Sequence, residues 1–277
     1  MRMQGGLEGC VLKDDAPFFY NKFMDCDGLI IATPVWTLTT PGYFMHLRDR
    51  ALGPFSDVAG AMELKKMQGA GMGSIFGGRI TIDERAFKSR AGDFISVGGA
   101  PLPNWVCLTL PLLHTMTFPP QVAIVDQMQV LKANQQVGSV LLNDKAVKRA
   151  RQLGRNVAEA MGKPSDEVKY MGDEAGTCPV CHLDLMVVRK NSLECAICGV
   201  KGDIKVDGGK ITVVFSKEEQ KKSRLAIEGK RIHFFEIRDV IQELGPRYGE
   251  IPAKLGKYKS YKTPIKPPSK ARRKTRA

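Results

Sequence analysis

The chain contains no hydrophobic run approaching the ~20 residues that a membrane-spanning helix requires. Its first ten residues, MRMQGGLEGC, lack the apolar core of a secretory signal peptide. Seven cysteines among 277 residues are too few for a disulfide-stabilised scaffold. These absences predict a soluble, cytoplasmic protein, and the 43% of hydrophobic residues suffice for a normal core.

Acidic residues are scarce at the C-terminal end of the chain. The net charge is +13, and residues 252–277 contribute ten Lys and Arg with no Asp or Glu. The rest of the chain is therefore nearly neutral, which argues against a broad nucleic-acid surface on the fold itself. The polar, Pro-rich tail is expected to be disordered. This tail either binds polyanions or only increases the solubility of the chain, and both interpretations stay open.

The segment from Cys26 to Arg50 organises the first part of the chain. Its apolar run, Gly28 to Ala32, ends at Thr33-Pro34 and reads as a buried strand. A polar turn follows, and Thr40-Pro41 suits a cap and first turn of a helix. In an open α/β sheet, the loop between such a strand and helix lies at the carboxyl edge, where ligands bind.

Two further strands and a closing helix are predicted downstream. An insertion-like stretch at residues 51–92 is expected to be a loop with a helical turn at residues 63–67. After it, Phe94 to Val97 forms a strand that ends in Gly98-Gly99. Gln121 to Val125 forms the last strand. Asn143-Asp144 then cap an amphipathic helix that ends at Gly162, and its Arg and Lys residues, Arg149 among them, are expected to face solvent. Trp105, between the second and third strands, either covers a bound ligand or packs within the fold, and packing is expected.

Residues 9–162 resemble the flavodoxin-like NAD(P)H-dependent FMN reductases and their iron–sulfur flavoprotein relatives. The similarity rests on Thr33-Pro34-Val35-Trp36 after the first strand, Asp49-Arg50 at the helix end and the Gly98-Gly99 loop. It implies FMN bound by Thr33, Pro34, Val35, Trp36, Thr37, Gly98 and Gly99. It also implies NAD(P)H as the hydride donor, a homo-oligomer and an electron acceptor that the residues do not identify. No acid–base catalytic residue is nominated, because the flavin itself performs the redox chemistry.

The N-terminal segment departs from the pattern of this family. Its members begin with a further strand and a Ser/Gly-rich loop that grips the FMN phosphate, using backbone N–H groups and a helix N-terminus. The residues before Asp14 match only the end of a later turn, so the first strand of the sheet is predicted to be missing.

Two C-x-x-C pairs mark a second, smaller unit. They are Cys178/Cys181 and Cys195/Cys198, separated by thirteen residues and set among short β-prone segments. Four thiolates on two turns can hold one tetrahedral ion, and a unit this small has little core without it. The spacing therefore predicts a metal-bound β ribbon. Ser216, after this ribbon, is predicted to cap the start of a helix.

Zinc is favoured at this site because four protein ligands close the coordination sphere, as in structural zinc centres. Iron stays open as an alternative, since CAICGVKG at residues 195–202 resembles a rubredoxin knuckle. The first pair, CPVCH, lacks the Gly that follows it in rubredoxin. His182 is expected at the surface.

The sequence thus predicts an α/β fold with a flavodoxin-like parallel sheet, helices on both of its faces and an appended zinc ribbon. The expected domains are residues 1–165 for flavin binding, 166–245 for the ribbon with a helical extension, and 246–277 for the basic tail. The predicted function is an FMN-dependent NAD(P)H oxidoreductase. The alternative is a binding module, in which the ribbon and tail contact nucleic acid or protein and the flavodoxin-like part is a scaffold.

Overall fold

The computed structural model describes residues 12–52, 56–71, 82–133, 138–173, 176–256 and 258, without the side chains of residues 51 and 52. Cys10 and most of the basic tail therefore lie outside the described residues. The chain divides into two compact units, Met1–Phe234 and Phe235–Ala277, each of which is described by itself. The domain boundaries expected from the sequence stay predictions.

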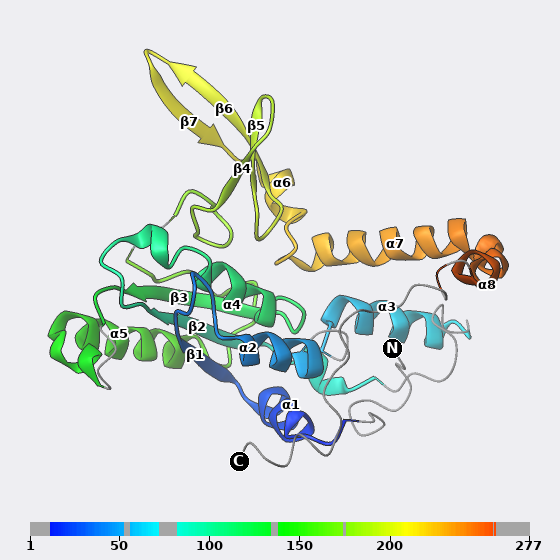
Figure 1. Cartoon of the computed structure of the whole chain (residues 1–277), viewed down its shortest axis with the longest axis horizontal. Helices are drawn as coiled ribbons and strands as arrows, with labels where there is room; N and C mark the ends of the chain where they lie inside the picture. Colours follow the sequence, from blue (N-terminus) through cyan, green and yellow to red (C-terminus); the bar gives the residue numbers. More distant parts are fainter. Residues whose placement is uncertain are drawn as a thin grey trace. The chain divides into compact units, whose positions relative to one another are not determined.

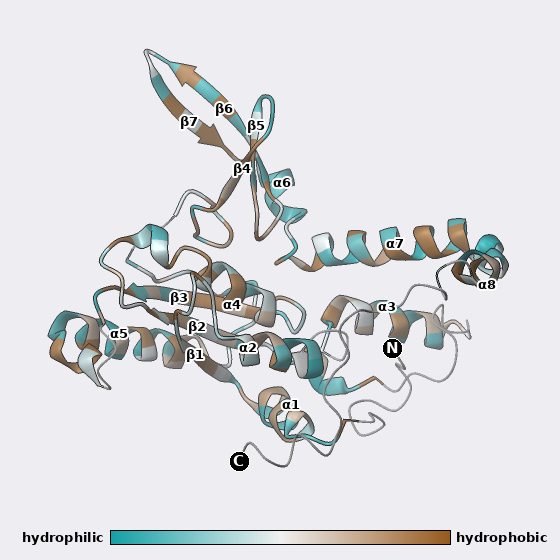
Figure 2. Ribbon diagram, viewed as in Figure 1, coloured by the Kyte–Doolittle hydropathy of each residue, from teal (hydrophilic) through white to brown (hydrophobic). Residues whose placement is uncertain are grey.

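A three-stranded parallel sheet lies at the centre of the first unit (Figure 1). Its strands are β1 (Gly28–Pro34), β2 (Arg90–Val97) and β3 (Val122–Val130), in that spatial order. β1 and β3 are mainly hydrophobic (Figure 2), whereas β2 alternates apolar residues with Arg90, Asp93 and Ser96. The predicted strands are confirmed, although β2 begins four residues before Phe94 and β3 runs five residues past Val125. Because the strands are parallel, their carboxyl ends lie along one edge.

Helices cover both faces of this sheet because apolar side chains of each strand alternate between the faces. Phe94 of β2 packs with Met24 and Leu113, from α1 (Ala16–Asp25) and α4 (Thr109–Thr117). Ala91 points to the opposite face and packs with Val157 of α5 (Asp144–Ala160). The flavodoxin-like arrangement expected from the sequence is thereby confirmed.

The structure corrects one prediction about the segments between these elements and extends another. Thr40 caps no helix: α2 (Gly42–Leu47) begins after Pro41, and the buried Thr40 hydroxyl has no partner among the described residues. The helical turn expected at residues 63–67 lies within a longer helix, α3 (Val58–Gly69), which begins where the Asp57 carboxylate accepts the Gly60 N–H at 2.6 Å. Shorter helical turns complete the first part of the chain, at Arg48–Leu52, Glu84–Phe87, Pro103–Trp105 and Ser139–Leu142.

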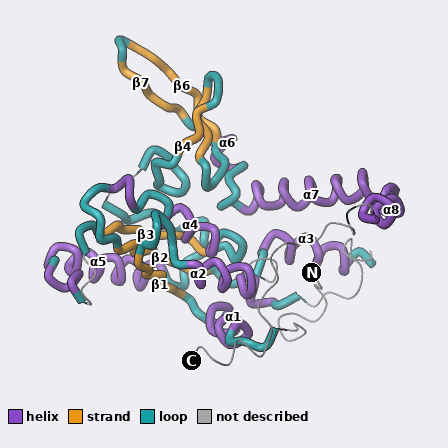
Figure 3. The backbone as a smooth tube through the Cα atoms, viewed as in Figure 1, coloured by secondary structure: helices purple, strands orange, loops and turns teal. Residues whose placement is uncertain are grey.

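The cysteine-containing segment forms a separate antiparallel sheet of four short strands (Figure 3). They are β4 (Met186–Val188), β5 (Ser192–Cys195), β6 (Lys201–Asp207) and β7 (Lys210–Val214). The tight turn between β6 and β7 uses Gly208 and Gly209 at φ 54° and 79°, in the left-handed region that glycine adopts without a steric penalty. The predicted ribbon is confirmed.

Helices form the remainder of the described chain. They are α6 (Lys217–Lys221), α7 (Ile227–Leu244), a 3₁₀ turn (Gly245–Glu250) and α8 (Ile251–Gly256). Ser216 caps α6 as predicted, because its hydroxyl accepts the Glu219 N–H at 3.1 Å. The first turns of α7 are held within the first unit by an ion pair from Arg231 to Glu63, at 2.6 Å. None of the described helices is long and apolar enough to cross a membrane.

A buried ionic cluster fastens α5 to the sheet. The Asp126 carboxylate on β3 is fully buried and accepts hydrogen bonds from both terminal nitrogens of Arg149, one of them at 2.7 Å. Asn156, about two turns after Arg149 on α5, donates a hydrogen bond to the same carboxylate at 2.8 Å. Breaking such a pair leaves an uncompensated charge in the interior, which typically costs about 3–5 kcal/mol.

Asp93 of β2 lies beside this cluster and differs from Asp126. It is fully buried, and neither carboxylate oxygen has a hydrogen-bond partner among the described residues. Burial raises the pKa of Asp93 to about 8, and the negative charge of Asp126 adds to this effect. Asp93 is therefore protonated in the folded protein at neutral pH, whereas it is ionised in the unfolded chain.

We predict that Arg149→Met lowers the free energy of unfolding by about 3 kcal/mol, because Asp126 loses its bidentate partner. Urea unfolding followed by circular dichroism measures this change. The control is Arg155→Met on the same helix, since the exposed Arg155 bonds only to Gln152 among the residues that the structure describes. Equal stabilities of the two variants would show that the buried pair is not what holds α5.

We also predict that stability falls as the pH rises from 6 to 8. The folded-state pKa of Asp93 lies above the ordinary value of 3.8, so its favourable contribution exists at low pH and is lost as the pH approaches 8. The expected loss is about 2 kcal/mol over these two pH units. Asp93→Asn should abolish this slope in urea unfolding, and an unchanged slope in that variant would contradict the assignment.

Candidate functional site

The two turns predicted to surround a flavin lie next to each other at the carboxyl edge of the sheet. Pro34 and Val97, the last residues of β1 and β2, are register partners. The Val35 N–H donates to the Val97 carbonyl at 2.9 Å, which ties the start of one turn to the other strand. The structure therefore brings Thr33 to Thr37 and Gly98-Gly99 to one place, although these residues are 60 or more positions apart in the chain.

The side chains of the first turn differ in what they can contact. Thr33 is buried, and its hydroxyl donates to the Pro34 carbonyl at 3.1 Å. Its side chain thus faces the protein. Trp36, in contrast, leaves 68% of its surface exposed.

The backbone N–H groups of these two turns can donate hydrogen bonds to a ligand only where they have no partner in the chain. Three of them, on Val35, Trp36 and Gly98, already have partners. Val35 and Gly98 donate to Val97 and Val130, and Trp36 donates to Thr39 at 2.8 Å. Within the described part of the chain, the N–H groups of Thr37, Leu38 and Gly99 have no acceptor. Three main-chain donors at the edge are thus available to a polar ligand such as the flavin ring, which fits the predicted cofactor.

Packing within the chain explains why residues 98 and 99 are glycine, which the sequence alone did not reveal. A Cβ atom on Gly98 would overlap the Val106 side chain, and one on Gly99 would lie 2.9 Å from the Ala133 carbonyl oxygen. Packing within the chain therefore already requires glycine here. The idea that glycine allows a flat ring to approach is not needed to explain these residues.

Exposed apolar side chains lie in the loops that follow all three strands. Trp36 comes after β1, and Trp105, with 58% of its surface exposed, comes after β2. Leu102, Leu141 and Leu142 are exposed in the loops after β2 and β3. The expectation that Trp105 packs was wrong, and its exposure leaves the alternative that it covers a bound molecule. Exposed apolar side chains in the loops at the carboxyl ends of strands suit contact with a flat, apolar ligand.

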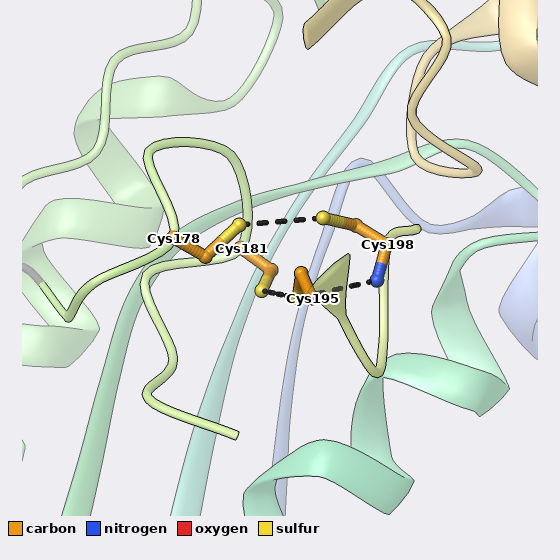
Figure 4. A group of neighbouring side chains, drawn as sticks. All are labelled: Cys178, Cys181, Cys195 and Cys198. Atoms are coloured by element: carbon orange, nitrogen blue, oxygen red, sulfur yellow. Dashed lines mark hydrogen bonds between the residues drawn. The ribbon is translucent and has the colours of Figure 1, made fainter. Parts of the chain in front are cut away.

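The four predicted metal cysteines converge at one buried point (Figure 4). Their Sγ atoms all lie within 4.8 Å of one another, with 3.3 Å between Cys178 and Cys198 and 3.4 Å between Cys181 and Cys195. At most 1% of each residue is exposed. Four thiolates about 2.3 Å from a central ion would be about 3.8 Å apart, so the arrangement fits a tetrahedral metal.

The electrostatics of this cluster also suit a bound cation. Hydrogen bonding with Cys178 lowers the pKa of the Cys195 thiol and raises the pKa of the Cys181 thiol. The four groups therefore cannot all ionise together without a positive charge between them. His182 is not part of the group and is not at the surface as expected. Its half-buried ring stacks on Tyr170, with 3.8 Å between the ring centroids.

A side chain of the parallel sheet supports the first cysteine turn. Gln127 of β3 donates to the carbonyls of Cys181 and His182, at 3.0 and 2.9 Å. Its amide oxygen lies 3.2 Å from Nε2 of His114, which is fully buried. Burial lowers the pKa of His114 to about 4, so this histidine is neutral at physiological pH. The sequence offered no signal for this contact, because Gln127 is an ordinary polar residue on an edge strand.

Comparison with known proteins identifies close relatives. The chain is 37% identical over 237 residues to Flavone synthase cfoJ of Aspergillus candidus. The aligned region covers 84% of this chain and 70% of that protein. A solved structure of a flavone reductase superimposes with a TM-score of 0.76 and 27% identity, over 95% of this chain and 87% of that one. A second solved structure, an apo NADH:FMN oxidoreductase, is too dissimilar to support a conclusion, at a TM-score of 0.33 and 18% identity over 59% of this chain and 69% of that one.

No family model matches the sequence. The flavone synthase nevertheless shares more than a third of its aligned residues with this chain, and the flavone reductase shares the fold over nearly the whole length. The family resemblance read from the strand-end motifs is thereby confirmed. The chain belongs to the family of these two proteins, among the flavodoxin-like relatives of the NAD(P)H-dependent FMN reductases.

Proposed function

We propose that this protein is an FMN-dependent oxidoreductase that uses NAD(P)H to reduce a flat aromatic acceptor. The observation that carries the proposal is the adjacency of the two strand-end turns, with three unpaired N–H donors, in a chain of this family. The donors of Thr37, Leu38 and Gly99 would bind the polar atoms of the flavin ring. Bound FMN supplies hydride and electron transfer, while the chain supplies position and exclusion of water.

Two independent observations support a flat aromatic molecule as the electron acceptor. The relatives are named for flavone chemistry, and flavones are flat and largely apolar. The same edge of this chain exposes Trp36 and Trp105, whose faces can stack on an aromatic molecule. We therefore propose a flavonoid or similar planar polyphenol as the electron acceptor.

Titration with FMN tests the first part of this proposal. The protein should quench FMN fluorescence with saturable binding, and should then oxidise NADH or NADPH when a flavone is added. A protein that takes up no FMN, yet shifts a nucleic-acid probe at low salt, would instead support the binding-module alternative.

We predict that Trp105→Ala raises the KM for a flavone acceptor about tenfold and leaves FMN affinity unchanged. Stacking on one aromatic side chain is worth about 0.5–1.5 kcal/mol beyond its buried area, which corresponds to a change of this size. Because the indole is largely exposed, the variant should fold normally. Tyr248→Ala removes a similarly exposed aromatic from the second unit and serves as the control. An unchanged KM would remove Trp105 from the acceptor site.

We also propose that Cys178, Cys181, Cys195 and Cys198 hold one structural Zn²⁺. The support is the buried convergence of four thiols in a unit whose own core consists largely of these cysteines. Thiolate coordination closes the site on all four sides, so no open position remains for a reacting molecule. The ion would then stabilise the ribbon and take no part in the redox reaction.

Cys198→Ser should reduce the zinc content from one ion per chain to less than 0.2, measured by elemental analysis, and should lower the unfolding temperature. The free energy of zinc binding is folding energy for such a unit, so loss of a ligand destabilises it. Cys107→Ser is the matched control, because Cys107 is exposed and lies outside the cluster. One iron per chain in the unaltered protein would contradict the zinc assignment and favour a rubredoxin-like centre.

A further inference from the structure

The turn that carries Trp36 has an unusual backbone. Thr37 and Leu38 have φ angles of 49° and 72°, both in the left-handed region. Two-residue hairpin turns of this type normally use Asn-Gly, because a Cβ atom is disfavoured at positive φ. A β-branched threonine at such a position is a clear outlier, and strain of this kind accumulates at functional sites.

Contacts inside the turn close it but do not fix its place. Trp36 and Thr39 exchange backbone hydrogen bonds of 2.8 and 3.1 Å across the turn. The Thr39 hydroxyl adds a bond to the Trp36 carbonyl at 3.3 Å. All of these groups belong to the turn itself. The Val35 N–H bond to Val97 ties only the residue before the turn to the sheet, so Thr37 and Leu38 need an outside contact of their own.

That outside contact comes from the start of α4. The Leu38 carbonyl accepts a hydrogen bond from the Thr109 hydroxyl at 3.2 Å and one from the Leu108 N–H at 3.3 Å. Thr109 is fully buried. It is the first residue of α4, but its hydroxyl caps no N–H of that helix and reaches a carbonyl 71 positions earlier.

The anchored turn determines the direction of three groups in the proposed redox site: two backbone N–H groups and one indole ring. The free N–H groups of Thr37 and Leu38 belong to the two strained residues, so their directions depend on the left-handed conformation. The exposed Trp36 side chain is the residue directly before them. A turn that relaxed toward negative φ would redirect both donors and the indole.

We infer that Thr109 is a positioning residue of the redox site: its hydroxyl holds the strained turn 36–39, which presents two amide donors and the Trp36 indole to the bound molecules. This inference rests on the proposed function, since it assigns a purpose to the turn within that site. Thr109 itself touches neither cofactor nor acceptor.

The experiment uses the full chain with Trp105→Phe, which leaves Trp36 as its single tryptophan. Three variants are compared in this background: Thr109→Val, which removes the hydroxyl at constant size, Thr109→Ser, which keeps it, and Thr109→Val combined with Thr37→Asn and Leu38→Gly. The combined variant gives the turn the residues that favour its shape without an anchor. The readouts are Trp36 fluorescence anisotropy, FMN affinity and the unfolding temperature.

Thr109→Val is expected to lower the anisotropy and to weaken FMN binding about tenfold, with little change in unfolding temperature. A tenfold change corresponds to the loss of about one hydrogen bond. Thr109→Ser should match the parent, and the combined variant should recover at least half of both losses. A residue with only a structural role would change the unfolding temperature and would not be rescued by substitutions in the turn.

The possible failures are distinguishable. Equal anisotropy and equal FMN affinity in Thr109→Val and Thr109→Ser would overturn the inference while leaving the proposed function intact. If the parent binds no FMN, the proposed function fails, and with it the role given to Thr109. If Thr109→Val does not fold, Thr109→Ala makes the same comparison without adding a methyl group at the site.

Discussion

The parallel pairing of β1 with β2 is the constraint on which the candidate site depends. It makes Pro34 and Val97 neighbours, so the turns that follow them begin at the same edge of the sheet. Without this register, a Thr-Pro-Val-Trp loop and a Gly-Gly loop would be unrelated surface features. Every later step follows from it: the unpaired amides, the exposed indoles and the strained turn all belong to segments that this pairing brings together.

The interior of the sheet shows a second constraint, imposed by polar groups rather than by apolar packing. Asp93 and Asp126 are register partners on β2 and β3, and both are fully buried. Asp126 is paired with Arg149, while Asp93 has no hydrogen-bond partner among the described residues and carries a proton. Two adjacent buried carboxylates cannot both be charged at acceptable cost, so the division of roles is a physical necessity. Gln127, the next residue of β3, uses the opposite face to support the cysteine turn.

Much of this architecture could be predicted because its signals are local. An apolar run ended by Pro, a Gly-Gly pair after a strand and two C-x-x-C turns each specify a backbone geometry within a few residues. Asn143 and Ser216 act as the helix caps that their positions suggested. The confirmed fold and the convergence of four cysteines both derive from such patterns.

The features that the sequence did not predict depend on contacts between distant segments. Thr40 resembles a helix cap, yet the helix starts after Pro41. Trp105 would be placed in the core by its hydrophobicity, but its loop leaves it exposed. Arg149 looked like a solvent-exposed helix residue, and a charged Asp within an apolar strand was the only hint of its buried partner. The left-handed turn at Thr37 and Leu38 contradicts local preference, because Thr109 on a later helix holds it.

The most direct test of the account is residue-resolved amide hydrogen exchange with and without FMN. The amides of Thr37, Leu38 and Gly99, which have no acceptor within the described part of the chain, should exchange rapidly in the free protein and slow markedly when FMN is bound. The amides of Val35 and Gly98 are already bonded to neighbouring strands and should be protected in both states. Unchanged exchange at Thr37, Leu38 and Gly99 under saturating FMN would contradict the claim that these two turns hold the flavin.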